Sequence, residues 1–279
     1  MKPVLRAEGV SYAVGSKLLV RDVSLDIVPG RLVVGIGPNG AGKSTLMRLL
    51  SGELPPSQGR VLCGDTAVRA VPPVGLACIR AVLPQSSRLA FPFTVAEVVR
   101  IGLDGIGRGL DRVRREEILA DALRRADVAG LAGRTFQTLS GGEGQRAQFA
   151  RVLAQLAAGR TVADRQALLL DEPIASLDLK HQLALLETAA DLAHRDGVAV
   201  FAILHDLNLA AAFADEIAVL HGGRLVAQGP PEAVLHDRMV REVFEVELTV
   251  GAVPSGGRPF LLPARAVASG KREIPTTPG

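Results

Sequence analysis

The segment GPNGAGKST carries the residue types that bind a nucleoside triphosphate. It matches G-x-x-x-x-G-K-[ST], a pattern in which glycines let backbone N–H groups approach phosphate oxygens closely. Lys43 can reach the β- and γ-phosphates, and the Ser44 hydroxyl can bind Mg²⁺. The residues that we assign to this loop are Gly37, Pro38, Asn39, Gly40, Ala41, Gly42, Lys43, Ser44 and Thr45.

The neighbours of this loop favour the same interpretation. The apolar run RLVVGI at 31–36 precedes it, and the helical segment TLMRLLSG at 45–52 follows it. The N-terminus of that helix, near Gly42, adds partial positive charge for an anion. The alternative is a glycine-rich turn that contains GKS by chance. The strand–loop–helix context argues against that alternative.

Two adjacent carboxylates, Asp171 and Glu172, follow the buried run ALLL at 167–170. Open parallel sheets bind ligands at the carboxyl edge of their strands. Asp171 suits Mg²⁺ coordination there, whereas Glu172 points to the opposite side and could polarise the attacking water. His205 follows a third run, VAVFAIL at 198–204, at the same edge, where it could touch the γ-phosphate. The remaining histidines, interpreted as ordinary surface or core residues, are His181, His194, His221 and His236.

The elements that position these residues indicate an α/β fold. The apolar runs at 31–36, 167–170 and 198–204 predict strands that are buried on both faces, as in parallel sheets. The segment 179–195 has a helical period, so we expect a helix there. Its apolar face comprises Leu183, Leu186, Ala190 and Ala193. Strands that alternate with helices predict a mainly parallel sheet.

Other parts of the chain follow different patterns. Residues 4–28 alternate and predict antiparallel strands, and 216–229 predict a hairpin that turns at Gly222 and Gly223. A middle block, about 88–160, is rich in helix signals and predicts an inserted helical subdomain. Within it, Thr94 and Glu97 fit a capping box, and 111–128 read as a charged amphipathic helix. After about 250 the chain loses periodicity, and we expect its last dozen residues to be mobile.

The sequence LSGGE at 139–143, followed by GQRAQFARVLAQ, carries a family resemblance. Read from its residues alone, it is a Ser-capped helix start with Glu143 at the capping-box position, which can also bind anions. With the phosphate loop, it resembles the nucleotide-binding subunits of ABC transporters. In that family this signature loop caps the ATP held by a second copy, and Ser140, Gly141 and Gly142 match it. Glu143 departs from the commoner Gln.

Further motifs fall in the order of the family, and the resemblance covers residues 4–245. It implies that Tyr12 stacks on adenine, that Gln85 senses Mg²⁺, and that Asp178 lies in the loop passing between paired subunits. It also implies that His205 is the switch histidine. Ile174 stands where a hydroxyl residue is usual. The implied fold is a P-loop NTPase core with a mainly parallel sheet, an antiparallel β subdomain and the helical subdomain, in one domain of residues 1–250 before a tail at 251–279.

Within this family, FPFTVAEVV at 91–99 and SLDLKHQ at 176–182 resemble importers of iron chelates, haem and vitamin B12. The segment AAGRTVADRQ at 157–166 looks most like that of haem importers. The resemblance implies ATP and Mg²⁺ as cofactors, with Ser44, Gln85 and Asp171 at the metal and Glu172 as general base. It implies as partners a second copy, an integral membrane permease and indirectly an extracytoplasmic substrate-binding protein, at the cytoplasmic face of the membrane. An ATPase of a siderophore or vitamin B12 importer, or of soluble iron–sulfur assembly, remains an alternative.

The composition of the chain narrows the class of protein further. With 48% hydrophobic residues and 22% charged residues, the chain has ample material for a buried core. The net charge of +3 is spread among interleaved acids and bases, so we expect no nucleic-acid partner. Cys63 and Cys78 have neither zinc-site nor disulfide-framework spacing and are expected to be reduced. The N-terminus lacks the apolar core of a signal peptide, and no apolar run is long enough to span a bilayer.

Overall fold

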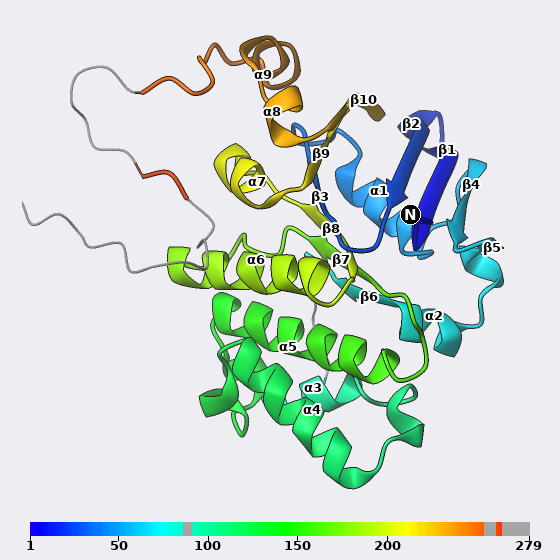
Figure 1. The fold of residues 1–279 in the computed structure, drawn as a ribbon, viewed down its shortest axis with the longest axis vertical. Helices are drawn as coiled ribbons and strands as arrows, with labels where there is room; N and C mark the ends of the chain where they lie inside the picture. The colour runs from blue at the N-terminus through cyan, green and yellow to red at the C-terminus, as the bar shows by residue number, and fades with distance from the viewer. Residues whose placement is uncertain (86–90, 254–260, 264–279) are drawn as a thin grey trace, which may run out of the picture.

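A six-stranded sheet forms the centre of the computed structural model, which describes residues 1–85, 91–253 and 261–263 (Figure 1). Its strand order is β10-β9-β3-β8-β7-β6. In that order the strands span Arg224–Gly229, Glu216–His221, Leu32–Ile36, Ala199–Ile203, Ala167–Asp171 and Arg80–Leu83. Every neighbouring pair is parallel except the β9–β10 hairpin. The predicted mainly parallel sheet and the predicted hairpin are therefore confirmed.

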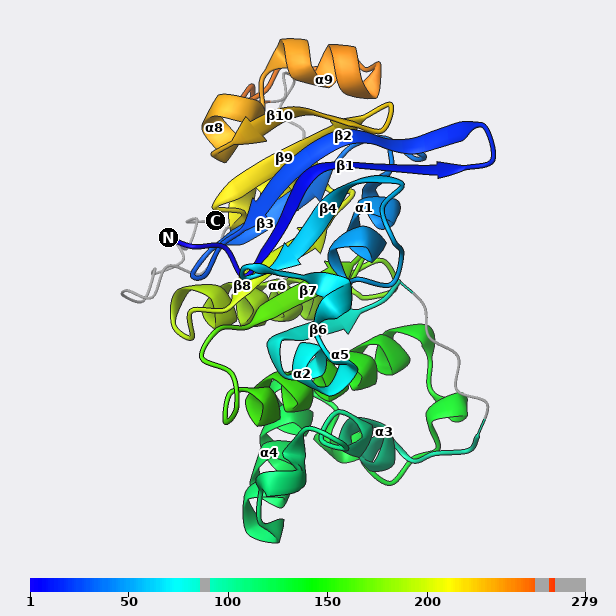
Figure 2. The ribbon, with the colours of Figure 1, turned by 90° about the vertical axis from the view of Figure 1, so that its right-hand side faces the viewer.

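A second sheet is antiparallel and has the order β2-β1-β4-β5. Its strands span Lys17–Ile27, Leu5–Val14, Gln58–Cys63 and Thr66–Ala67. Helix α1 (Lys43–Leu50) lies between the two sheets (Figure 2), and one buried cluster joins it to both. The alternating pattern of 4–28 predicted the first two of these strands, and this prediction is confirmed.

Helices cover the opposite face of the six-stranded sheet (Figure 1). The longest are α5 (Gly141–Gly159) and α6 (Leu179–His194). Around α5 lie α2, α3 and α4, which span Pro73–Ile79, Val95–Ile101 and Arg112–Arg125. Helices α7, α8 and α9 span Leu207–Phe213, Pro231–Val234 and Asp237–Phe244. Four 3-10 turns, η1 to η4, span Val68–Ala70, Gly107–Gly109, Ala129–Leu131 and Phe136–Thr138.

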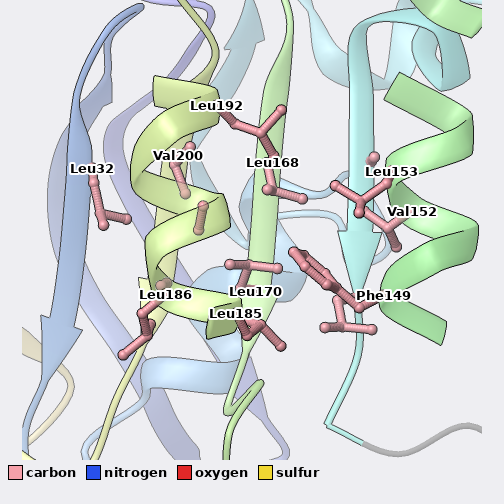
Figure 3. Close-up of a cluster of buried hydrophobic side chains, with 14 of the residues drawn as sticks. Leu32, Phe149, Val152, Leu153, Leu168, Leu170, Leu185, Leu186, Leu192 and Val200 are labelled. Atoms are coloured by element: carbon pink, nitrogen blue, oxygen red, sulfur yellow. The ribbon is translucent and has the colours of Figure 1, made fainter. Parts of the chain in front are cut away.

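Strands β3, β7 and β8 are buried on both faces, which explains why they read as continuous apolar runs. On β7, Leu168 and Leu170 face a cluster that includes Phe149 of α5 and Leu185 of α6 (Figure 3). Leu169, between them, faces the cluster around α1 on the other side of the sheet. This alternation fixes the register of the strand, because a slip of one residue would exchange the two faces.

Both predicted capping boxes are present, Thr94 with Glu97 on α3 and Ser140 with Glu143 on α5. The amphipathic segment 111–128 forms α4. Strands β4, β5 and β6 and helices α2, α8 and α9 were not predicted. The proposed tail at 251–279, including its last dozen residues, lies mostly outside the described residues. In the ranges that the structure describes, no helix combines the length and the apolarity that crossing a bilayer requires.

Candidate functional site

The predicted phosphate loop joins the end of β3 to the start of α1. Gly37, Gly40 and Gly42 all have positive φ, at 147°, 78° and 100°. Two of them also allow close backbone packing. A Cβ at Gly37 would lie 2.1 Å from the Leu220 carbonyl oxygen, and a Cβ at Gly42 would lie 2.5 Å from that of Leu19. Glycine is therefore required at both positions by conformation and by space.

Lys43, the first residue of α1, turns its side chain back across the loop. Its Nζ donates hydrogen bonds to the carbonyl oxygens of Gly37 at 2.8 Å and Pro38 at 2.9 Å. Burial lowers the pKa of the Lys43 ammonium, and the charges of Glu172 and Asp171 oppose that shift. The Lys43 ammonium is thus held over the phosphate loop, which leads directly into α1. A cation in this place can bind an anionic ligand.

The carboxyl end of β7 brings Asp171 next to this loop. The Ser44 hydroxyl donates to Asp171 Oδ1 at 3.2 Å. Burial raises the pKa of the Asp171 carboxyl, and the hydrogen bond from Ser44 partly offsets this effect. A buried carboxylate gains from a nearby cation, because opposite charge favours its ionised form.

Glu172, the next residue, has φ +48° and is held by two side chains from other elements. Gln85, just after β6, donates its Nε2 to Glu172 Oε2 at 2.7 Å. His205, after β8, places its Nε2 at 2.6 Å from Glu172 Oε1. Gln85 and His205 therefore both contact the Glu172 carboxylate. The sheet-edge argument anticipated that Glu172 and His205 lie together, whereas Gln85 was named from the family resemblance.

The oxygen atoms at this edge fit a small divalent cation. Mg²⁺ prefers few protein oxygens together with water and phosphate oxygens. Ser44 Oγ and Asp171 Oδ1 already lie 3.2 Å apart, and the Gln85 amide oxygen is not the atom that bonds Glu172. Among the described residues no group of three or more His, Cys, Asp and Glu could hold a metal. A metal here would thus depend on one carboxylate, a hydroxyl, an amide and a bound phosphate.

The signature segment lies at the start of α5, against the loop 176–178. The Ser140 hydroxyl accepts from the Glu143 backbone N–H at 3.3 Å, and the Glu143 carboxylate accepts from the Ser140 N–H at 2.8 Å. A Cβ at Gly142 would lie 2.9 Å from the Ser176 carbonyl oxygen. The bare backbone of the signature glycines therefore packs directly on this loop.

Two separate cavities are lined by several of the predicted nucleotide-binding residues. A cavity of about 210 Å³ is lined by Lys17, Leu19, Asn39, Gly40, Gly42, Lys43, Ser44, Thr45 and Glu172. A cavity of about 390 Å³ is lined by Ser140, Gly141, Gly142, Glu143, Arg146, Ser176, Leu177, Asp178 and His181. The two sets share no residue. Within one chain the structure thus brings the phosphate loop, Asp171, Glu172, Gln85 and His205 together, and leaves Ser140–Gly142 and Asp178 apart from them.

Tyr12 occupies a different environment from the phosphate loop. It pairs with Val20 across the β1–β2 hairpin and is half-buried against the cluster around α1. It is not among the residues that line the 210 Å³ cavity, whereas Lys17 and Leu19 of the same hairpin are. Sequence reasoning missed those two residues, because the packing of β2 on the phosphate loop, seen in the approach of the Leu19 carbonyl to Gly42, has no sequence signal.

His181 and Arg146 were also missed as site residues. Both line the cavity at the signature segment. A helical position three residues after Asp178 could have suggested contact between His181 and that cap. Nothing in the sequence pairs either residue with Asp127, which both of them contact.

A model of the ABC transporter family matches residues 20–175. The chain is 48% identical over 263 residues to the hemin import ATP-binding protein HmuV of Rhodopseudomonas palustris (strain BisA53), covering 94% of this chain and 95% of that protein. It is 47% identical to the protein of the same name from Agrobacterium fabrum, covering 93% and 98%.

Solved structures share the fold. The ATP-binding subunit of an ABC transporter superposes with a TM-score of 0.71 at 23% identity, covering 89% of this chain and 95% of that one. A dimeric ATP-binding cassette bound to ADP and Pi superposes with a TM-score of 0.70 at 24% identity, covering 81% and 98%. At these identities the likeness concerns the fold alone.

Proposed function

The chain belongs to the ABC transporter family, and from this membership we propose that it is the ATP-hydrolysing subunit of a membrane importer that takes up haem. The observation that carries the choice of haem is the identity of 48% over 94% of the chain to a hemin import ATP-binding protein. Because the alignment covers 95% of that protein, the similarity extends over the whole cassette and is not limited to one motif.

We assign the roles at the site from the family motifs, and the geometry supports part of this assignment. The N–H groups of 39–45 and Lys43 would bind the triphosphate, and Ser44, Gln85 and Asp171 would hold Mg²⁺, which would neutralise phosphate charge. Glu172 would take a proton from the water that attacks the γ-phosphorus as the bond to the β-phosphate oxygen breaks. The contacts of Gln85 and His205 with the two Glu172 oxygens support this role, because they fix the carboxylate. His205 would also contact the γ-phosphate, and Tyr12 remains the candidate for the adenine.

A second copy would complete each site. ATPase subunits of ABC importers work as dimers with membrane permeases, and the separation of the two cavities on this chain supports a head-to-tail pair. In that pair the ATP on the phosphate loop would meet Ser140, Gly141 and Gly142 of the partner subunit. The loop ending at Asp178 would pass between the subunits. Binding of ATP would favour the closed pair and hydrolysis would release it, which drives the permease.

Two further proposals concern the location of the subunit and the protein that delivers the substrate. We place the subunit peripherally at the cytoplasmic face of the membrane, since that is where ATP is available to a subunit that docks on a permease. An extracytoplasmic substrate-binding protein would deliver haem to the permease.

The test is co-purification followed by transport. The chain is expressed with a tag in its native host, extracted in detergent, and its partners are identified by mass spectrometry. The recovered complex is then placed in proteoliposomes and assayed for ATP-dependent uptake of haem, a ferric siderophore and cobalamin. We expect an integral membrane permease and uptake of haem, lost in the Glu172→Gln complex. Uptake of another substrate, or recovery of a soluble scaffold only, would refute the proposal.

A further inference from the structure

His181 lies between two carboxylates that belong to different parts of the molecule. Its Nδ1 is 2.7 Å from Asp178 Oδ1, and its Nε2 is 3.2 Å from Asp127 Oδ2. Asp178 is the N-cap of α6 and also accepts the His181 backbone N–H at 2.9 Å. Asp127 follows α4 in the helical region. Both nitrogens of one ring are therefore engaged, one on each side of a junction.

Arg146 of α5 reinforces the far side of this junction. Its Nη1 donates to the Asp127 carbonyl oxygen at 2.5 Å and lies 3.3 Å from Asp127 Oδ2. Lys180 Nζ lies 3.6 Å from the same carboxylate oxygen. Asp127 has φ +53°, a backbone conformation uncommon outside glycine, so the contacts hold a locally strained residue in place. Three elements, the end of α4, the first turns of α5 and the start of α6, thus meet at Asp127.

The junction combines two sheltered basic side chains with two exposed carboxylates. Only 17% of the His181 side chain and 15% of the Arg146 side chain is exposed, whereas 65% of the Asp127 side chain and 67% of the Asp178 side chain is exposed. Water screens the exposed carboxylates, so the junction is expected to act by fixing geometry rather than by adding much stability. The hydrogen bond from His181 lowers the pKa of the Asp127 carboxyl, and the backbone N–H of His181 lowers the pKa of the Asp178 carboxyl. One ring nitrogen of His181 thus lies within hydrogen-bond distance of each carboxylate.

The junction borders the cavity at the signature segment. His181, Arg146 and Asp178 line the same cavity as Ser140 and the signature glycines. Gly142 packs on Ser176, two residues before Asp178, without room for a Cβ. A shift of α6 relative to α4 and α5 would therefore change how the signature segment sits against the loop 176–178.

We propose that His181 is a positioning residue: its ring joins Asp178 to Asp127, so that the signature segment and the loop 176–178 reach the partner's ATP as one rigid surface. This inference rests on the paired sites of the proposed function, because only in a head-to-tail pair do both segments meet a nucleotide. His181 lines the cavity at the signature segment and does not line the cavity at the phosphate loop of its own chain. Its loss should weaken closure of the pair without weakening the first binding of ATP.

The main experiment uses the full chain with Glu172→Gln, which prevents turnover, and measures two constants. One is the affinity of dilute chain for ATP, and the other is the dissociation constant of the ATP-bound pair from analytical ultracentrifugation. We expect His181→Ala to leave ATP affinity within about twofold and to weaken pairing by about tenfold or more, the scale of one lost hydrogen bond to a charged group. His181→Gln, which keeps one donor, should fall between.

A double variant distinguishes a positioning role of His181 from a general destabilisation of the fold. If the bridge acts through Asp127, adding Asp127→Ala to His181→Ala should weaken pairing by less than about twofold more. His221→Ala, on an exposed histidine of the β9–β10 hairpin, is the matched control and should change neither constant. Unchanged pairing in His181→Ala, or full additivity with Asp127→Ala, would overturn the inference.

If no ATP-bound pair forms, the proposed paired site is itself contradicted. A second measurement then still tests the His181 bridge, because it uses the single chain. Spin labels are placed at Val113→Cys on α4 and Val226→Cys on β10, both exposed, in a chain with Cys63→Ala and Cys78→Ala. His181→Ala should broaden the distance distribution between the labels relative to His221→Ala. Identical distributions would overturn the bridge independently of pairing.

Discussion

Replacing Gly42 by alanine tests how the backbone of the phosphate loop is held. Gly42 caps α1 with φ +100°, and a Cβ there would lie 2.5 Å from the Leu19 carbonyl oxygen. Gly40, in the same loop, has φ +78°, but a Cβ there would meet nothing within 4 Å. Both alanine variants therefore impose backbone strain, and only Gly42→Ala adds a collision with β2.

The expected cost follows from these two terms. A non-glycine residue at positive φ costs about 1–3 kcal/mol, of which about 0.4–1 kcal/mol is recovered because alanine restricts the unfolded chain. We expect Gly40→Ala to lower the free energy of unfolding by that net amount, about 1 kcal/mol. At Gly42 the Cβ is also about 0.9 Å short of ordinary contact distance, so the loop and β2 must separate. Such overpacking adds about 1–3 kcal/mol.

Urea denaturation of the nucleotide-free chain measures the difference. Far-UV circular dichroism is the suitable signal, because the chain has no Trp and one Tyr. Gly42→Ala should unfold with a free energy about 1–3 kcal/mol below that of Gly40→Ala and with the same dependence on urea concentration. Its affinity for ATP should also fall further than that of Gly40→Ala. Equal stability of the two variants, within about 0.5 kcal/mol, would refute the argument from the Leu19 carbonyl.

Glu172→Gln is expected to reduce ATP turnover by about 10²–10⁴-fold while equilibrium ATP binding persists, because the amide keeps the shape but cannot accept the proton. Asp171→Asn should raise the free energy of unfolding of nucleotide-free, metal-free chain at neutral pH, since burial raises the pKa of that carboxyl. In urea titrations across pH, this gain should be absent below the usual pKa of 3.8 and grow as pH rises through the higher folded value. Thr94→Ala should cost about 1 kcal/mol in the same assay, because α3 loses the capping box with Glu97.

Each of these outcomes has a matched control. Glu242→Gln, at an exposed side chain of α9, repeats the first substitution away from the site and should leave turnover unchanged. Turnover near the parental rate in Glu172→Gln would contradict its role as base. Asp65→Asn, at an exposed carboxyl, should not reproduce the pH-dependent gain of Asp171→Asn. Thr94→Ser keeps the capping oxygen, so a loss as large as that of the alanine variant would contradict the cap.

The elements that the sequence predicted correctly are those whose local pattern and burial agree. The runs at 167–170 and 198–204 are apolar throughout because helices cover one face of the sheet and α1 with the antiparallel sheet covers the other. The missed elements lack such a signal. Strand β4, QGRVLC, has three exposed residues at its start, and α8 is only four residues long. Their places are set by pairing with β1 and by packing near β10, which depend on distant parts of the chain.

The same distinction applies to the candidate site residues. Asp171 ends a predicted strand, Glu172 and His205 follow predicted strands, and parallel strands bring their carboxyl ends together whatever the detailed packing. Gln85 follows β6, which was not predicted, and it was named from the family resemblance alone. His181 belongs to another class, because its partner Asp127 is 54 residues away and is placed by the turn that ends α4. No periodicity or motif predicts that turn, which requires positive φ at an aspartate. A residue that joins two parts of a fold is therefore visible only once both parts are placed, and its role has to be argued from contacts rather than from spacing.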